Sequence, residues 1–146
     1  MKFFTPITTL VFAAAAALAA PSATTTVTVS YDETYDNAAG SLLTVACSDG
    51  PEGMINKGYT TFGSLPGFSN IGGAAAISGW GSDQCGTCWK LTYNGTSINV
   101  LAIDHADAGF NIALGALNRL TNNNGVFLGR VNAQAESVDG SACGLP

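Results

Sequence analysis

Four cysteines limit what this chain can fold into more than any other feature. They are Cys47, Cys85, Cys88 and Cys143. An even number of cysteines is typical of disulfide bonding in a small secreted chain. Three pairings are possible, and the residues alone do not choose between them. A bridge between Cys85 and Cys88 would close a very small ring and suggest redox chemistry. Either other pattern would close long loops, each stabilising the fold by roughly 3–4 kcal/mol in the chain-entropy model.

The first twenty residues indicate that the chain is secreted. Lys2 supplies a positive charge, the stretch 7–20 is almost wholly apolar, and small residues follow at 17–21. This pattern is typical of a signal peptide, here residues 1–20. The apolar run is shorter than the roughly 20 residues that span a bilayer, and no basic cluster follows it. We therefore expect an extracellular protein without a membrane span, with one domain at residues 21–146.

The charge of the chain is low and unevenly signed. Five Lys and Arg stand against ten Asp and Glu, so the net charge is −5. The few cationic residues are scattered along the sequence and form no basic cluster. Nucleic acids and anionic lipid surfaces are therefore poor partners. A weakly charged, glycine-rich and asparagine-rich chain suits a neutral polar partner better.

Apolar periodicity predicts about six short strands and one helix. The strands are expected at 27–31, 42–46, 87–93, 97–104, 126–131 and 133–138, and the helix at 110–120. Asn94-Gly95 is a strong signal for a hairpin turn. The long stretch 52–84 reads as irregular, and such segments often carry function. These elements favour a mostly β fold that closes as a six-stranded barrel.

Asp104 is the carboxylate best placed for chemistry or ligand contact. It ends a strongly apolar strand beside the glycine-containing loop 108–109. Two interpretations stay open, namely contact with a ligand and the acceptance of backbone N–H bonds that hold the loop. No second carboxylate is fixed opposite it, as glycoside hydrolysis by the usual route requires. Asn111 has two roles open as well, a helix N-cap and a ligand contact.

Other catalytic and metal sites are disfavoured by the sequence. His105 is the only histidine, and no Gly-x-Ser-x-Gly elbow accompanies it. A hydrogen bond that caps the end of its strand is the favoured role for His105. The Cys85–Cys88 motif precedes a strand rather than a helix, which argues against a redox site. A zinc site would need paired ligands that are absent, so we expect no metal and no cofactor.

A possible modification site lies in the predicted hairpin turn. Asn94-Gly95-Thr96 is a sequon for N-glycosylation, and a turn of a secreted protein is accessible to the modifying enzyme. The sequence leaves the occupancy of Asn94 open.

Several motifs in a fixed order resemble the cerato-platanin family of small secreted fungal proteins. The resemblance covers residues 27–145, nearly all of the predicted mature chain. Its motifs lie at 29–32, 45–50, 65–73, 79–80, 85–90, 103–104, 109–112 and 128–131. It implies a six-stranded double-psi β-barrel with one or two short helices. It also implies the disulfides Cys47–Cys85 and Cys88–Cys143.

The resemblance carries expectations for the binding site. Members of the family bind N-acetylglucosamine oligomers of the chitin type in a shallow groove. Asp104, Asn111 and Tyr31 match polar positions of that groove, whereas His105 falls where the family varies. Trp80 and Trp89 are candidates for stacking on sugar rings, although small barrels often bury tryptophan in the core.

The function implied is that of a secreted, non-catalytic protein of the fungal cell wall that binds carbohydrate. Family members act as elicitors of plant defence, virulence factors or allergens, and expansin-like loosening of cell walls is ascribed to them. The expected partners are N-acetylglucosamine oligomers or other wall glycans, host plant receptors, and further copies of the chain. Two alternatives are a weak β-glucan hydrolase with Asp104 as the acid and a self-assembling interfacial protein.

Overall fold

The computed structural model describes residues 2–16 and 23–146. Residues 2–16 form neither helix nor strand, and their side chains are exposed. The cleavage site expected at 17–21 falls outside the described residues, so the signal peptide stays a prediction. Within the described ranges, no helix has the length and apolar character needed to cross a membrane.

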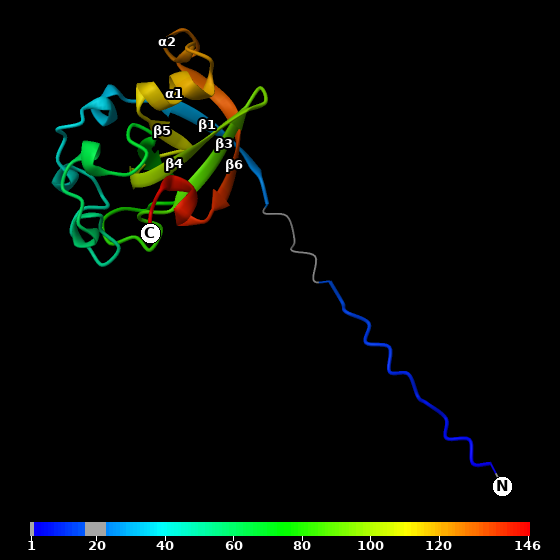
Figure 1. The fold of residues 1–146 in the computed structure, drawn as a ribbon. Coiled ribbons are helices and arrows are strands. Elements are labelled where there is room, and N and C mark those ends of the chain that lie inside the picture. Colours follow the sequence, from blue (N-terminus) through cyan, green and yellow to red (C-terminus); the bar gives the residue numbers. More distant parts are fainter. Residues whose placement is uncertain (1, 17–22) are drawn as a thin grey trace.

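Six strands close into a barrel in the order β1-β5-β2-β4-β3-β6 (Figure 1). The β1–β5 and β2–β4 pairs are parallel, and the other four pairs are antiparallel. The predicted mostly β, six-stranded barrel is confirmed. The strands are β1 (Thr25–Tyr31), β2 (Ile71–Ala74), β3 (Cys88–Tyr93), β4 (Thr96–His105), β5 (Phe110–Ile112) and β6 (Arg130–Val138).

The helices are short and lie outside the barrel. The α-helix α1 (Leu114–Leu120) packs against β4 and β1, and α2 (Gly125–Leu128) follows it at the top of the molecule (Figure 1). Two α-helices agree with the expectation of one or two. The described residues also contain five single-turn 3₁₀ helices. Four lie between β1 and β2 and one follows β6, namely η1 (Glu33–Asp36), η2 (Leu42–Thr44), η3 (Ile55–Lys57), η4 (Phe62–Ser64) and η5 (Gly140–Cys143).

The core explains why the strands form where they do. In β6, every second residue from Val131 to Ala135 is buried, as expected for a strand with one face exposed to solvent. In β4, residues Val100 to Ile103 are all completely buried, because the barrel interior covers one face and packed segments including α1 cover the other. The prediction of a strand buried on both sides is therefore confirmed for β4.

Two predicted strands were wrong. Residues 42–46 form η2 and a turn, since the Ser41 hydroxyl caps the turn by accepting the N–H of Leu43. Residues 126–128 belong to α2, and β6 begins only at Arg130. At the other end of the chain, β1 begins at Thr25, two residues earlier than predicted.

The strands β2 and β5 had no recognisable sequence signal. The predicted number of six strands is correct, but not every predicted strand corresponds to an observed one. β2 has the sequence Ile-Gly-Gly-Ala and is wholly buried, so it shows no alternation of polar and apolar residues. A Cβ added to Gly72 would lie 2.4 Å from the carbonyl oxygen of Asn111. Glycine is thus required at Gly72 by the close approach of β5.

The predicted helix at 110–120 begins later than expected. Phe110–Ile112 form β5, so Asn111 lies in a strand and is not the N-cap of the helix. The side chain of Asp36 takes over the capping, because its two oxygens accept the N–H groups of Leu114 at 2.7 Å and Gly115 at 2.8 Å. A contact between residues so far apart in sequence cannot be read from local pattern.

Both disulfides have the pairing implied by the family resemblance. Cys47 is bonded to Cys85, and Cys88 to Cys143, with sequence separations of 38 and 55 residues. The two cysteines of the Cys85–Cys88 motif therefore have different partners, and none of the four thiols is free for redox or metal chemistry.

The close contact at Gly72 gives a test of the fold. We expect Gly72→Ala to lower the free energy of unfolding by roughly 1–3 kcal/mol, because the new methyl group must push apart two backbones that cannot yield locally. Urea denaturation measures the change. Gly140→Ala is the matched control, since its added Cβ would meet only Leu145 at 3.5 Å or more. Equal stability of the two variants would contradict the close β2–β5 packing.

Candidate functional site

An open groove of about 660 Å³ lies on the barrel surface where β1, β5 and the end of β4 meet. It contains Tyr31 and Asn111, two of the three residues expected to bind carbohydrate, but Asp104 is not among its lining residues. The lining consists of Ser30, Tyr31, His105, Ala106, Asp107, Ala108, Asn111 and Arg130.

Strand register places the polar residues of this surface in a row. Arg130 pairs with Ser30, Ser30 with Asn111, Asn111 with Gly73, and Gly73 with Asp104. Because adjacent strands lie about 4.8 Å apart, the backbones of Asn111 and Asp104 are about 10 Å apart across Gly73. The register thus sets Asp104 beside the groove even though its side chain does not line it.

Asn111 presents a hydrogen-bonding group to the groove. Its Oδ1 accepts the hydroxyl of Ser30 at 3.1 Å. Its side-chain amide nitrogen makes no hydrogen bond to the described residues, so two N–H donors are free for a ligand. The side chain is fixed on one side and available on the other.

Asp104 serves as an anchor for three donors. Its Oδ1 accepts the backbone N–H of Ala46 at 3.0 Å and of His105 at 2.9 Å. Its Oδ2 accepts the hydroxyl of Tyr35 at 2.8 Å. The structure thus has the backbone contacts expected of a structural role, but they hold the segment at Ala46 and not the loop 108–109.

Tyr35 is the buried partner of Asp104. Burial raises the pKa of its phenol well above the usual value of 10, and the negative charge of Asp104 and the hydrogen bond to it act in the same direction. The charge of Asp32 adds a smaller contribution. Tyr35 therefore stays a neutral hydrogen-bond donor at any physiological pH.

His105 connects the end of β4 to two further segments. Its Nδ1 lies 2.6 Å from the carbonyl oxygen of Ile77, and its Nε2 lies 3.1 Å from Oδ1 of Asp107. Both partners are acceptors, so both contacts are hydrogen bonds only when the ring carries two protons. The bond to Ile77, followed by the bond to Asp107, raises the pKa of His105 above its usual 6.5. The predicted capping of a strand end is thus observed.

Sequence reasoning gave no binding role to four further polar residues of the groove, namely Ser30, His105, Asp107 and Arg130. When His105 is protonated it forms an ion pair with Asp107 on the groove wall, and Arg130 lies at the start of β6. Only the predicted loop after β4 offered a signal for Asp107. Arg130 had none, because the strand predicted there ran through it without a break.

The two tryptophans differ in their surroundings. Trp89 is half-buried and packs edge-on against Phe110, with ring centroids 5.5 Å apart. Trp80 is 67% exposed on the connection between β2 and β3. Of the two candidates for stacking on a sugar, only Trp80 presents most of its surface to solvent.

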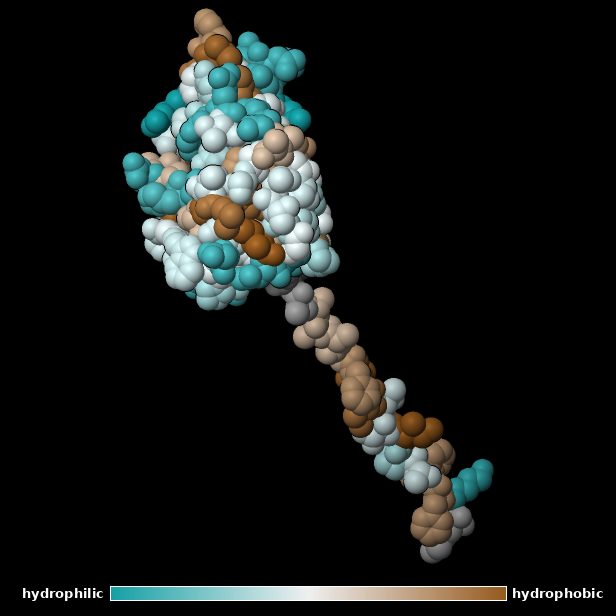
Figure 2. Space-filling view, turned by 90° about the vertical axis from the view of Figure 1, so that its left-hand side faces the viewer, coloured by the Kyte–Doolittle hydropathy of each residue, from teal (hydrophilic) through white to brown (hydrophobic). Residues whose placement is uncertain are grey.

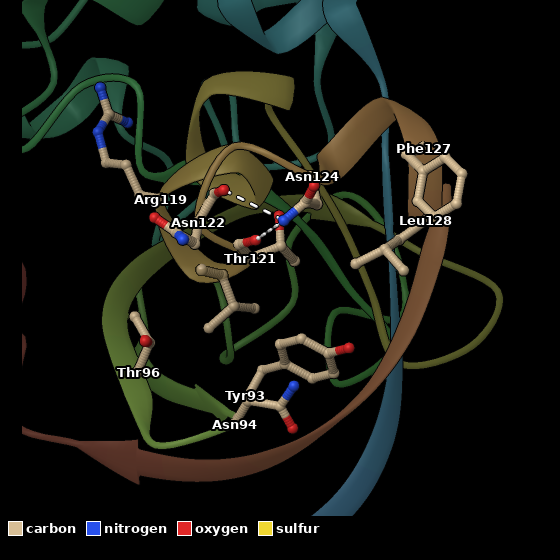
Figure 3. A pocket seen from close by; sticks show the side chains of 10 residues that line it. Tyr93, Asn94, Thr96, Arg119, Thr121, Asn122, Asn124, Phe127 and Leu128 are labelled. Carbon is tan, nitrogen blue, oxygen red and sulfur yellow. Dashed lines mark hydrogen bonds between the residues drawn. The ribbon is translucent and has the colours of Figure 1, made fainter.

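Asn94 lies at the tip of the predicted hairpin, which is confirmed between β3 and β4. Its φ of 47° and that of 79° at Gly95 fit the tight turn that Asn-Gly favours. Asn94 is exposed at the rim of a second hollow of about 640 Å³, which reaches Arg119 on α1 and Phe127 on α2 (Figure 3). The sequon is accessible, and its occupancy stays a prediction.

The end of the domain at α2 exposes apolar residues. Figure 2 shows hydrophobic residues at the top of the domain, the end where α2 lies in Figure 1, and a second hydrophobic patch lower on the same face. Val126 is 64% exposed and Phe127 89% exposed in this helix. The hollow beside α2 shares no lining residue with the polar groove that contains Tyr31 and Asn111.

Comparison with known proteins identifies relatives over almost the whole chain. The family model Cerato-platanin matches residues 27–145. Allergen Asp f 15 of Aspergillus fumigatus is 49% identical over 149 residues, covering 98% of this chain and 97% of the relative. The crystal structure of cerato-platanin 3 from M. perniciosa has a TM-score of 0.80 and 48% identity, covering 83% of this chain and all of the other. The solution structure of the fungal elicitor Cerato-Platanin has a TM-score of 0.70 and 43% identity, covering 80% and 95%.

The bond between Tyr35 and Asp104 can be tested by removing one hydroxyl. We expect Tyr35→Phe to lower the free energy of unfolding by about 1–3 kcal/mol, because it leaves a partly buried carboxylate oxygen without its donor. Urea denaturation at neutral pH measures this. Tyr59→Phe is the control, since the Tyr59 hydroxyl makes no hydrogen bond to the described residues. Similar losses for both variants would contradict the anchoring role of Asp104.

The single histidine allows a direct test of the contacts of His105. We expect its NMR titration midpoint to lie above 6.5 and to fall in Asp107→Asn, which removes the negative charge. Because the folded pKa is raised, the stabilisation from these contacts is fully present below pH 6.5 and is lost as pH rises through the folded value. A midpoint at or below 6.5 in the wild type would disprove the doubly bonded imidazolium.

Proposed function

The chain belongs to the cerato-platanin family, and from this membership we propose that it is a secreted, non-catalytic protein that binds carbohydrate of the fungal cell wall. Its ligands are oligomers of N-acetylglucosamine, the repeating unit of chitin, or related wall glycans. The groove lined by Tyr31 and Asn111 receives them.

The observation that carries this proposal is the set of neutral polar groups in the groove. Asn111 has free amide donors, and the side chains of Ser30 and Tyr31 bear hydroxyls that both donate and accept. A pyranose ring with an acetamide group offers many hydroxyls and one amide, which these groups can satisfy. The affinity is modest, because each new hydrogen bond replaces one to water and much of its energy is offset.

The contacts of Asp104 support binding rather than hydrolysis. Oδ1 of Asp104 accepts two backbone N–H groups, and Asp104 does not line the groove in which a scissile bond would lie. Oδ2 is occupied by the Tyr35 hydroxyl. Hydrolysis by the usual route also needs a second carboxylate across the scissile bond, and the nearby Asp107 is paired with His105. We therefore place Asp104 as a support of the groove wall, not as a catalytic acid.

We infer the biological role from the names of two relatives and from the proposed export of the chain. One solved relative is titled a fungal elicitor, and a sequence relative is named an allergen. We propose that this chain is likewise exported, with residues 1–20 as its signal peptide, and acts outside the cell as an elicitor of plant defence or a virulence factor. Binding of wall glycans without cleavage would also allow expansin-like loosening, by competition with the hydrogen bonds between glycan chains.

A second function, self-assembly at interfaces, is favoured by one observation. The apolar residues Val126 and Phe127 project from α2 on a domain whose remaining large apolar side chains are mostly buried. Such side chains gain free energy when they leave water. We propose that this end of the domain mediates association between copies of the chain.

Titration of the disulfide-bonded protein with N-acetylglucosamine oligomers, followed by NMR amide shifts, tests the binding function. We expect saturable shifts near Tyr31 and Asn111, and an affinity about tenfold lower in Asn111→Ala, which corresponds to about 1.4 kcal/mol. Gln134→Ala is the matched control, because it also removes an amide with one side-chain hydrogen bond, here to Thr26. Absence of saturable binding to any chitin oligomer in the wild type would overturn the chitin assignment.

A further inference from the structure

Trp80 is an exposed aromatic side chain that the fold holds in place. Its indole Nε1–H donates a hydrogen bond to Oδ1 of Asp49 at 2.9 Å. The ring lies against Gly50, where an added Cβ would come within 3.3 Å of ring atom Cε2. The indole is therefore ordered before any ligand arrives, which reduces the entropy lost on binding. Even so, 67% of Trp80 remains exposed.

The surroundings of Trp80 match a sugar better than a protein. Two exposed neighbours are small or charged, namely the next residue Gly81 and the hydrogen-bond partner Asp49. No heavy atom lies within 4 Å of a Cβ added at Gly79 or Gly81, so the space beside the indole is open. Protein interfaces need a contiguous patch far larger than one side chain. One ordered indole with hydrogen-bonding groups at its edge suits a pyranose ring, which has an apolar C–H face and a polar rim.

The contacts of Trp80 and Asp49 tie this platform to the groove. Asp49 lies three residues after Ala46, whose N–H binds Asp104. Trp80 lies three residues after Ile77, whose carbonyl oxygen binds His105. Three residues of extended chain span at most about 11 Å. Asp49 and Trp80 therefore lie within about 11 Å of Ala46 and Ile77 along the chain, and Ile77 binds His105, which lines the groove.

On the basis of the proposed function, we propose that Trp80 forms a stacking subsite for a pyranose ring of the same neutral oligosaccharide that occupies the groove. The Asp49 carboxylate orients the indole. The Cys47–Cys85 disulfide links the chain segments that carry Asp49 and Trp80. Short oligomers then bind in the groove alone, and longer ones gain the contact with Trp80.

The test compares N-acetylglucosamine oligomers of increasing length with the disulfide-bonded protein, observed by NMR. We expect the indole N–H signal of Trp80 to move with the hexamer and to stay unchanged with the monosaccharide. We expect Trp80→Ala to weaken binding of the hexamer about tenfold and to leave binding of the disaccharide in the groove unchanged. Trp80→Phe, which keeps a ring but loses the bond to Asp49, should lie between the two.

Phe127→Ala is the matched control, since it removes an aromatic side chain that is 89% exposed on α2 and does not line the groove. It should leave binding of every oligomer unchanged. If Trp80→Ala binds the hexamer as tightly as the wild type while signals at Asn111 still shift, the stacking subsite is overturned and the proposed function stands. If no signal shifts with any oligomer, both are overturned.

Discussion

The carboxylate of Asp104 connects the end of β4 to two segments that precede it by 69 and 58 residues. It binds the Tyr35 hydroxyl of η1, the N–H of Ala46 and the N–H of its own neighbour His105. Cys47, which follows Ala46, donates its N–H to the carbonyl oxygen of Ile103 in β4 and is disulfide-bonded to Cys85. A partly buried carboxylate is costly unless its acceptors are satisfied. The positions of η1 and of the segment at Ala46 therefore depend on this one group having all three donors.

The two glycines of β2 determine the shape of the groove wall. The register between β2 and β4 shifts between Gly72 and Gly73, so Ile103 is an extra residue in β4. Beyond this bulge the chain folds back over β2, and a Cβ at Gly73 would lie 2.7 Å from the carbonyl oxygen of His105. The same segment continues into Ala106 and Asp107, which line the groove. Bulges commonly redirect side chains beside functional sites. Here the lack of side chains at the two glycines of β2 leaves room for the segment 105–107 to pass over β2.

The sequence could predict those elements whose signals are local. The β3–β4 hairpin has Asn94-Gly95 at its turn, and the buried part of β4 is a run of apolar residues. The disulfide pairing came from family resemblance, since spacing left three choices. In contrast, β2 has almost no side chains to show a period, and β5 is only three residues long beside a helical pattern. Such strands exist because neighbouring strands supply their hydrogen bonds.

The candidate site shows the same limit. The family resemblance assigned Tyr31, Asn111 and Asp104 to one groove. Tyr31 and Asn111 line a common groove and Asp104 does not, and the role of all three in binding carbohydrate stays a prediction. The hydrogen bond between Tyr35 and Asp104 joins residues 69 positions apart, and no local sequence pattern around either residue predicts it. The ion pair of His105 with Asp107 is local, yet its anchor is the carbonyl oxygen of Ile77, which any residue would provide. Long-range contacts to backbone atoms do not depend on the residue type of the partner, so the sequence cannot predict them.

The charges around the groove bear on which wall polymer fits it. The charge of Asp107 is paired when His105 is protonated, and Arg130 is exposed where water and salt screen it. The chain as a whole carries a net charge of −5, which repels acidic polysaccharides at long range. The groups left to recognise a ligand are the neutral amide and hydroxyls of Asn111, Ser30 and Tyr31. This balance favours a neutral glycan over a charged one, because a neutral glycan needs no uncompensated charge and loses nothing to the repulsion.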